Sequence, residues 1–292
     1  MKRKLHSVFA ALLLSVSTTW ASPFEDGVTA YQRGDYATAL KVFRSLATQG
    51  DAAGQFNLGV MYEKGHGVAL DYEQAVNWFR LAATQGLAEA QYNLGNMYRT
   101  GQGVAQDYVE AVKWFRLAAT QGYAKAQFNL GIRYAEGQGG PQDDAEAVKW
   151  FRLAAAQGIA EAQHNLGVMY DNGRGVTQNY AEAAKWFRLA AAQGFAKAQH
   201  NLGVMYDNGQ GVTQNYAEAV KWYRLAAAQG DAKAQSNLGL MYGKGLGVTR
   251  DNVRAHMWFS LGAVSGDSDS SLNRNIVAKR MTPQQIAEAQ KM

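Results

Sequence analysis

Six asparagines are the most regularly spaced residues in this sequence that could bind a ligand. They stand 36 residues apart, and each is followed by Leu and Gly. The six are Asn57, Asn93, Asn129, Asn165, Asn201 and Asn237. A side-chain amide both donates and accepts hydrogen bonds, so a row of amides matches the repeating N–H and C=O groups of an extended chain. The row therefore predicts peptide binding, with the alternative that each asparagine bonds to the neighbouring copy.

The residues beside these asparagines differ between copies, whereas most of the surrounding sequence repeats. The preceding position holds, in order, Phe56, Tyr92, Phe128, His164, His200 and Ser236. Three residues after the asparagine, Asn96 stands where the other copies have Val, Ile or Leu. If the asparagines face a groove, its N-terminal half is aromatic and its C-terminal half is more polar. Such a surface fits a peptide or a loop of another protein, because aromatic residues contribute strongly to protein interfaces.

Two histidines allow a second interpretation, a metal site. His164 and His200 occupy equivalent positions, and Asp171 and Asp207 follow two turns later in the same predicted helices. Neutral imidazole is a common metal ligand. Each copy contributes only one such histidine, however, which favours solvated or hydrogen-bonded side chains. We therefore predict no metal and no cofactor.

Motifs of the common catalytic classes are missing from the sequence. It has no His-Glu-x-x-His helix, Gly-x-Ser-x-Gly elbow, Walker loop or Ser-x-x-Lys pair. Six Gly-x-Gly segments recur without a following Lys-Ser or Lys-Thr, so they indicate loops and not phosphate sites. The absence of cysteine excludes disulfides, thiolate zinc sites and a Cys nucleophile. We predict that the protein is not an enzyme.

A repeated pair of helices must position the asparagines. In the copy from Leu87 to Gly122, apolar residues recur at helical spacing before and after the segment Gly101–Val104. Glycine adopts the positive φ values that end the first helix, and Asp107 with Glu110 predicts a capping box at the start of the second. A tryptophan recurs 36 residues apart from Trp78 to Trp258, which indicates core packing. A repeat of this length predicts an all-α solenoid, in which each hairpin buries its apolar face against its neighbours.

The repeated pattern resembles that of a known family. Ala-Gln-x-Asn-Leu-Gly-x-Met-Tyr, Gly-x-Gly-Val and Trp-Phe-Arg-Leu-Ala-Ala-x-Gln-Gly follow one another from about residue 51 to 266. This pattern is similar to the Sel1-like repeat, a relative of the tetratricopeptide repeat. The resemblance implies a right-handed α-solenoid of antiparallel helix pairs whose first helices line a concave groove. It also implies that asparagines at the matching position hold the backbone of an extended peptide.

Both ends of the chain depart from the repeat. Residues 22–50 lack the Gly-x-Gly-Val loop and are similar to a plain tetratricopeptide hairpin that caps the N-terminus. Residues 267–292 indicate a helix with a polar face and then a last helix, which Thr282 and Pro283 begin. The sequence thus predicts tandem repeats at 51–266 between two capping segments.

Residues 1–21 have the pattern of a secretory signal peptide. Lys2, Arg3 and Lys4 precede an apolar run that is too short to cross a bilayer, and small residues surround Ala21. Without this segment the net charge falls from +5 to +2, because the segment holds three basic residues and no acidic one. Such a weak charge argues against nucleic acid as a partner. We predict a periplasmic or secreted protein with no integral membrane span.

Taken with the resemblance, these observations predict an exported scaffold that binds a segment of another protein. The resemblance implies a bacterial envelope setting. The alternative is a cell-wall-active or β-lactam-binding hydrolase, an activity associated with cysteine-rich relatives. This chain lacks their paired cysteines and a serine nucleophile motif. Nothing in the sequence fixes the oligomeric state, since solenoids can stack end to end.

Overall fold

The computed structural model describes residues 22–292, and the predicted signal peptide at 1–21 lies outside the described residues. Within residues 22–292 the chain forms sixteen α-helices and no strand, which confirms the all-α prediction. Its contacts divide the chain into two units, residues 1–82 and residues 83–292. Each unit is described by itself.

The first unit contains two helical hairpins. Its helices are α1 (Pro23–Gln32), α2 (Tyr36–Thr48), α3 (Ala52–Lys64) and α4 (Tyr72–Thr84), the last of which ends in the second unit. A complete capping box between Ser22 and Glu25 begins α1. Phe43 and Met61 are fully buried between the helices, and burying a side chain of this size stabilises the fold by about 1.5–3 kcal/mol.

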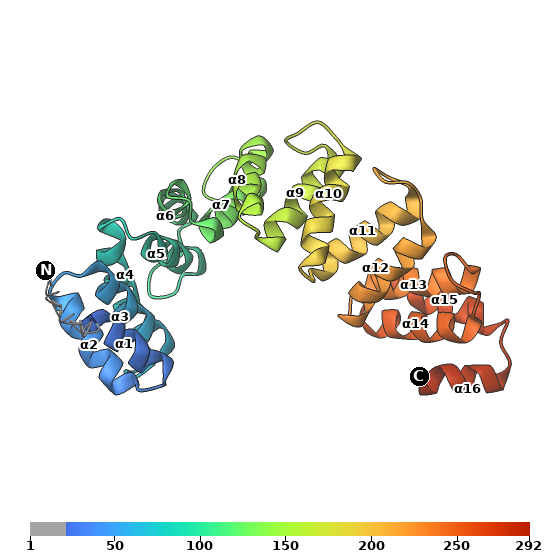
Figure 1. Ribbon diagram of the computed structural model, residues 1–292, viewed down its shortest axis with the longest axis horizontal. Coiled ribbons are helices and arrows are strands. Elements are labelled where there is room, and N and C mark those ends of the chain that lie inside the picture. The colour runs from blue at the N-terminus through green and yellow to red at the C-terminus, as the bar shows by residue number, and fades with distance from the viewer. Residues whose placement is uncertain (1–21) are drawn as a thin grey trace, which may run out of the picture. The chain divides into compact units, whose positions relative to one another are not determined.

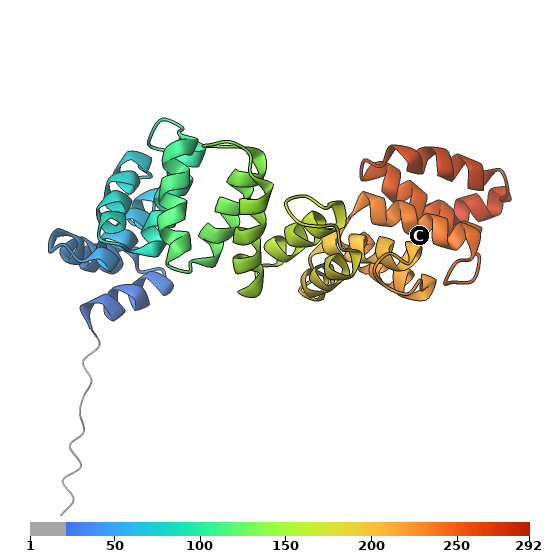
Figure 2. The same ribbon diagram turned by 90° about the horizontal axis from the view of Figure 1, so that it is seen from above.

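The second unit is a succession of helical hairpins (Figures 1 and 2). Its helices are α5 (Ala88–Thr100), α6 (Tyr108–Thr120), α7 (Ala124–Glu136), α8 (Asp144–Ala156), α9 (Ala160–Asn172), α10 (Tyr180–Ala192), α11 (Ala196–Asn208), α12 (Tyr216–Ala228), α13 (Ala232–Lys244), α14 (Asn252–Val264), α15 (Ser268–Ala278) and α16 (Pro283–Lys291). From α5 to α15, each helix contacts the next one in the chain. Because a helix buries one face against each sequential neighbour, the unit is the predicted solenoid of helix pairs.

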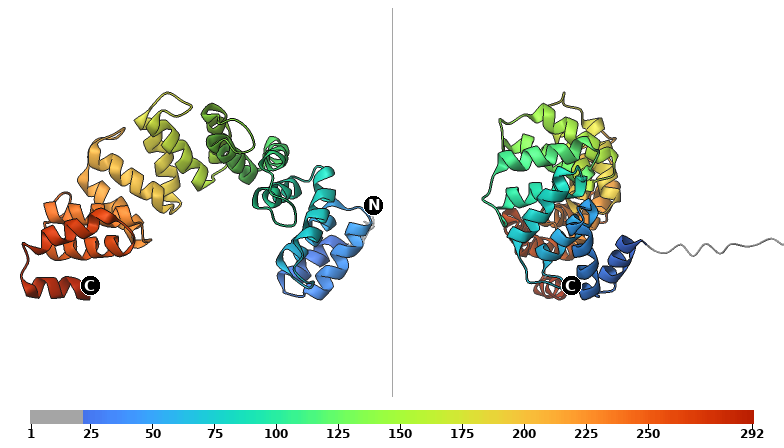
Figure 3. Two further views of the ribbon diagram at one scale, coloured as in Figure 1. Left: turned by 180° about the vertical axis from the view of Figure 1, so that it is seen from behind. Right: turned by 90° about the vertical axis from the view of Figure 1, so that its left-hand side faces the viewer.

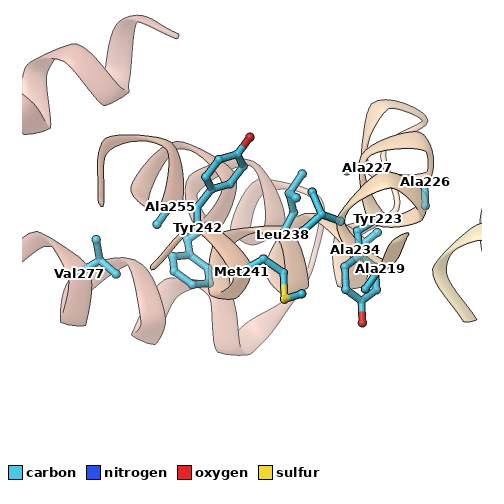
Figure 4. Close-up of a cluster of buried hydrophobic side chains, with 12 residues drawn as sticks. Ala219, Tyr223, Ala226, Ala227, Ala234, Leu238, Met241, Tyr242, Ala255 and Val277 are labelled. Atoms are coloured by element: carbon cyan, nitrogen blue, oxygen red, sulfur yellow. The ribbon is translucent and has the colours of Figure 1, made fainter. Parts of the chain in front are cut away.

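Each repeat supplies the same small core. In the hairpin of α13 and α14, Leu238 and Met241 lie between Tyr223 of α12 on one side and Ala255 of α14 on the other (Figure 4). Alanines such as Ala234 have no exposed surface, so neighbouring helices approach closely at these points. The tryptophans are half-buried and pack against the cores of adjacent hairpins, as predicted: Trp150, Trp186, Trp222 and Trp258 do so in this unit.

The second helices begin with only half of the predicted capping box. Asp107 accepts the backbone N–H of Glu110, and Asp143, Asn179 and Asn215 make the equivalent bond. The Glu110 side chain does not return to the cap and instead forms an ion pair with Lys113. The prediction of reciprocal boxes was therefore wrong for these helices, because the backbone N–H of the cap already donates to a carbonyl of the first helix, as Asp107 N–H does to Tyr98 O at 2.9 Å.

The C-terminal segment forms the two predicted helices. Asp267 caps α15, and a complete capping box between Thr282 and Gln285 begins α16. Both helices pack on α14 (Figure 3). In the part of the chain that the structure describes, no helix has the length and apolarity needed to cross a membrane.

Candidate functional site

The six asparagines lie at equivalent places on the first helices of the repeats, α3, α5, α7, α9, α11 and α13. All six side chains are half-buried. We call the surface that the five asparagines of the second unit share with the residues immediately before them the first-helix face. The Leu and Gly that follow each asparagine are buried in the core. Because they hold one side of the helix against the core, they fix the direction of the asparagine side chain.

Three of these asparagines bond to the preceding repeat. Asn129 Nδ2 donates to the Tyr92 hydroxyl at 3.3 Å. Asn201 Nδ2 lies 3.3 Å from His164 Nε2, and Asn237 Nδ2 lies 3.2 Å from His200 Nε2. These bonds agree with the alternative prediction, in which each asparagine bonds to the neighbouring copy. Their amides tie one first helix to the next and remain only half-buried.

The other candidates make local contacts. Asn57 donates to Ala53 O of its own helix at 2.8 Å, and Asn165 Oδ1 lies 3.2 Å from His164 Nδ1. Asn96 accepts a bond from Arg99 Nε at 3.2 Å. Asn93 is half-buried on α5.

The residue before each asparagine packs inward on an aromatic side chain of the second helix. The ring centroids of Phe56 and Phe79 are 5.8 Å apart, those of Tyr92 and Phe115 5.9 Å, and those of Phe128 and Phe151 6.0 Å. His164 and His200 make the same contact with Phe187 and Tyr223 at 5.7 Å and 6.0 Å, and Ser236 is buried. The aromatic side chains that the sequence predicts on this face are therefore only partly available at the surface, because each ring also packs on the second helix.

The two histidines belong to one chain of hydrogen bonds. His164 has Asn165 Oδ1 at Nδ1 and Asn201 Nδ2 at Nε2, so the neutral ring with its proton on Nδ1 satisfies both partners. Burial lowers the pKa of His164 and of His200, which favours this neutral form at pH 7. Among residues 22–292, no group of three or more His, Cys, Asp or Glu side chains is placed to hold a metal ion.

The lowered histidine pKa values predict a loss of stability in mild acid. A histidine whose pKa is lower in the folded chain binds fewer protons there than in the unfolded chain. The free energy of unfolding should therefore fall as the pH drops below about 6.5, the ordinary histidine pKa. Urea unfolding followed by circular dichroism between about pH 7.5 and pH 5.5 measures this effect.

A double substitution provides the control for this pH dependence. In His164→Tyr with His200→Tyr, a phenol replaces each imidazole, and Tyr92 shows that a phenol makes the same bond to the next asparagine. The variant should unfold at about the same urea concentration as wild type at pH 7.5 and should lose less stability at pH 5.5. Burial also lowers the pKa of His256, so some dependence should remain. An unchanged pH profile would show that these two histidines do not cause the loss.

Paired glutamines, to which the sequence assigned no role, join the two helices of a hairpin and tie that hairpin to the preceding one. Gln163 Nε2 donates to Ala155 O at 3.1 Å, and its Oε1 accepts from Gln193 Nε2 at 2.8 Å. The same arrangement recurs in the pairs Gln91 with Gln121, Gln127 with Gln157, and Gln199 with Gln229. The sequence signal that could have revealed this role is the recurring pair of glutamines 30 residues apart. Buried polar groups need such partners, so these pairs are part of the scaffold.

The last glutamine of this series lacks its partner, which makes a stabilising substitution predictable. Ser265 occupies the place where the next glutamine would be, and Gln235 Oε1 is buried with no hydrogen-bond partner in the described residues. Ser265→Gln should stabilise the α13–α14 hairpin by about 0.5–1.5 kcal/mol, the net contribution of one hydrogen bond. Urea denaturation and hydrogen exchange of α13 measure it, with Ser265→Ala as the control. Equal stability of the two variants would show that the bond does not form.

Three hollows lie along the first-helix face in the second unit. One of about 220 Å³ is bordered by Asn165, Val168 and Arg174. The next, of about 380 Å³, is bordered by Asn201 and by Lys197 and Lys233. A third, of about 470 Å³, is bordered by His200, Val204, Asp207, Lys233, Ser236, Asn237 and Leu240, and by Asp267 and Asp269 at the start of α15. Each hollow therefore meets one or more of the predicted site residues, in the half of the face that the sequence predicted to be polar.

Comparisons with known proteins agree on one family. The family model for the Sel1 repeat matches residues 52–87, 88–123, 124–159, 160–195, 196–231 and 232–267. The chain is similar to the crystal structure of a Sel1 repeat protein from Oxalobacter formigenes, with 33% identity and a TM-score of 0.73 over 83% of this chain and 97% of that one. It is also similar to c5321, a protective antigen of uropathogenic Escherichia coli strains that displays an SLR fold, with 28% identity and a TM-score of 0.54 over 92% of this chain and 82% of that one. No match is found among curated proteins.

Proposed function

The chain belongs to the Sel1 repeat family, and from this premise we propose that it is an exported scaffold that binds a segment of another protein along its first-helix face. Sel1 repeat solenoids are typical of interaction scaffolds, because stacked hairpins form an extended surface that no single repeat provides. The proposed partner is a protein, in keeping with this fold.

The observation that carries the proposal is the coincidence of the three hollows with the half-buried asparagines. Asn165, Asn201 and Asn237 border successive hollows at intervals of one repeat. Polar and charged side chains surround the second and third hollows, among them Lys233, Asp231 and Asp267. A segment of alternating charge that runs along α9, α11 and α13 fits this lining, with its backbone close to the amides.

Photo-crosslinking in cells tests the proposed face. A photoreactive amino acid replaces Lys197 or Lys233, exposed residues that border the hollows. The matched controls are Lys185 and Lys221, which are also exposed and lie on the second helices α10 and α12. We expect the same envelope protein to be captured from positions 197 and 233 and not from the controls. Capture of that protein to an equal extent from all four positions would overturn the proposal.

A charge reversal provides the second arm of this test. With the photoreactive amino acid at position 197, Lys233→Glu should reduce capture by about tenfold or more, whereas Lys221→Glu should leave it near the wild-type level. Circular dichroism should show the same helix content in both variants. Turnover of a chromogenic lactam by the purified protein, abolished by a substitution in one of the hollows, would favour the hydrolase alternative instead.

Export is the second component of the proposal. The supporting observation is the pattern of a charged segment, a short apolar run and small residues at 1–21. Fractionation of cells should place the protein outside the cytoplasm, with Ser22 as the N-terminal residue found by mass spectrometry. A cytoplasmic protein that retains residues 1–21 would refute export and would leave the proposed binding face untouched.

A further inference from the structure

An arginine occupies a core position in one repeat of the second unit. Met97, Met169, Met205 and Met241 occupy this position in the other repeats, and all are buried. In α7 the equivalent residue is Arg133, whose exposed fraction is only 9%. Arginine is almost never buried to this extent without partners that compensate its charge. The repeats therefore serve as internal references that mark Arg133 as exceptional.

The partners of Arg133 compensate its charge only in part. Its Nη1 donates to Gln138 Oε1, a neutral group, and its guanidinium lies 5.9 Å from the centre of the Tyr108 ring. Among the described residues its acidic partner is Glu136, at 3.4 Å from Nη2, whose side chain is 52% exposed. Arg133 Nε is buried and has no hydrogen-bond partner among the described residues. Burial lowers the pKa of Arg133, and Arg99 acts in the same direction.

A second departure from the repeat opens a pocket beside this arginine. In other repeats a loop valine packs on the core of an adjacent hairpin, as Val176, Val212 and Val248 do. The equivalent residue between α7 and α8 is Gly140, and a Cβ atom built there would meet no atom within 4 Å. A pocket of about 230 Å³ remains, lined by Val112, Arg116, Arg133, Tyr134, Gln138, Gly139, Gly140 and Pro141.

A second guanidinium completes the lining of this pocket. Arg116 on α6 donates from Nη2 to the Tyr134 hydroxyl at 2.7 Å. The equivalent bonds of Arg152 and Arg188 recur elsewhere in the unit, so the pair of Arg116 and Tyr134 is a fixed part of the fold. The pocket therefore combines two arginines, a tyrosine hydroxyl and the apolar side chains of Val112 and Pro141. Its volume is below the range of about 300–1,000 Å³ typical of sites for drug-sized ligands, so it fits a single small group.

We propose that this pocket, the Arg133 pocket, binds a carboxylate group. Arginine is the side chain that best matches a carboxylate, because its planar fork donates two parallel hydrogen bonds. A negative charge in the pocket would complete the neutralisation of the Arg133 charge, which the half-exposed Glu136 provides only in part. The carboxylate comes from an acidic side chain, from a peptide C-terminus or from a small organic acid. This proposal is independent of the first-helix face.

Nuclear magnetic resonance of the arginine Nε–H groups tests the proposal on the mature chain. Disappearance of one resonance in Arg133→Met assigns Arg133, and methionine is the residue that other repeats carry there. Sodium glutarate should shift the Arg133 resonance with saturation at millimolar concentrations, whereas sodium chloride of the same ionic strength should not. Acetyl-Ala-Ala-Ala with a free C-terminus, its amidated form, and acetyl-Ala-Glu-Ala-amide then distinguish the sources of the carboxylate.

Filling the pocket while retaining Arg133 is the decisive control. In Gly140→Val the loop valine of the other repeats returns. Gly140 is not among the glycines with a positive φ, and a position before proline favours the extended backbone that suits a β-branched residue. Binding of glutarate should weaken by about tenfold or more in this variant while circular dichroism remains helical. An unchanged affinity in Gly140→Val would overturn the proposal, as would a wild-type response without saturation. Tighter binding of inorganic phosphate than of every carboxylate tested would assign the pocket to phosphate and refute the carboxylate.

Discussion

Gly175→Ala is expected to destabilise the second unit by about 3–5 kcal/mol. Gly175 is the second glycine of the Gly-x-Gly segment between α9 and α10, with φ +67°. A Cβ atom built there would lie 2.2 Å from Asp144 O and 2.3 Å from Asp144 C, at the start of α8. Backbone atoms cannot move aside as a flexible side chain would. The cost therefore adds a backbone clash to the strain of a left-handed conformation.

Gly158→Ala separates these two contributions. Gly158 also has a positive φ, +90°, but a Cβ atom there would meet nothing within 4 Å. This variant should cost only the conformational strain, about 1–2 kcal/mol. Urea denaturation with hydrogen exchange measures both variants and locates the loss, because a solenoid can unfold locally around one repeat. Equal costs for Gly175→Ala and Gly158→Ala would show that the loop can withdraw from α8.

Arg133→Met is expected to have a large effect in the opposite direction. It should stabilise the second unit by about 1–4 kcal/mol, the range observed when apolar residues replace buried ion pairs, because the half-exposed Glu136 is not left as a buried unpaired charge. The reason is that Arg133 is desolvated, has an unpartnered Nε and forms an ion pair only with a half-exposed glutamate. Thermal unfolding and urea denaturation measure the gain. A loss of stability would instead show that the contacts with Gln138, Glu136 and Tyr108 outweigh the desolvation of the charge.

The reciprocal substitution is the control for this effect. Met169→Arg places an arginine at the equivalent position of α9, next to a loop in which Val176 fills the space that Gly140 leaves open. The residue equivalent to Glu136 is Asn172, which carries no charge. The variant should therefore lose about 3–5 kcal/mol, the cost of a buried charge without its partner. Similar stabilities for Met169→Arg and wild type would indicate that the position tolerates arginine in any repeat.

The sequence shows that Arg133 replaces the methionine of the other repeats, but it does not show that the arginine side chain is buried. The third copy also differs from the others at Gly140, Pro141 and Asp144, and these differences are visible in the sequence. Only the structure showed that Arg133 lines one pocket together with Gly140 and Pro141. Asp144, which replaces an aromatic residue, accepts two hydrogen bonds from Arg174 of the next loop, at 2.8 Å and 3.1 Å. This ion pair between residues 30 positions apart could not be inferred from local spacing.

The asparagine row likewise has features that the sequence predicted and features that it did not. Its regular spacing and its place within the first helices followed from the sequence, since helical periodicity is a local property. The hydrogen bonds of Asn129, Asn201 and Asn237 did not, because their partners Tyr92, His164 and His200 lie in the preceding repeat. Whether an amide meets a neighbouring side chain or an open surface depends on how two hairpins stack.

The sequence alone determined the helices, the loops, the caps and the 36-residue solenoid, because each depends on interactions within a few residues of the chain and on a repeated apolar pattern. The tertiary structure decided which repeated residues contact one another and which of them border hollows. It placed the glutamine pairs between the two helices of a hairpin, aligned Asn165, Asn201 and Asn237 with hollows, and brought the α9–α10 loop onto the start of α8. These features depend on distances between residues about 30 or more positions apart, which the packing of successive hairpins sets and which no local pattern encodes.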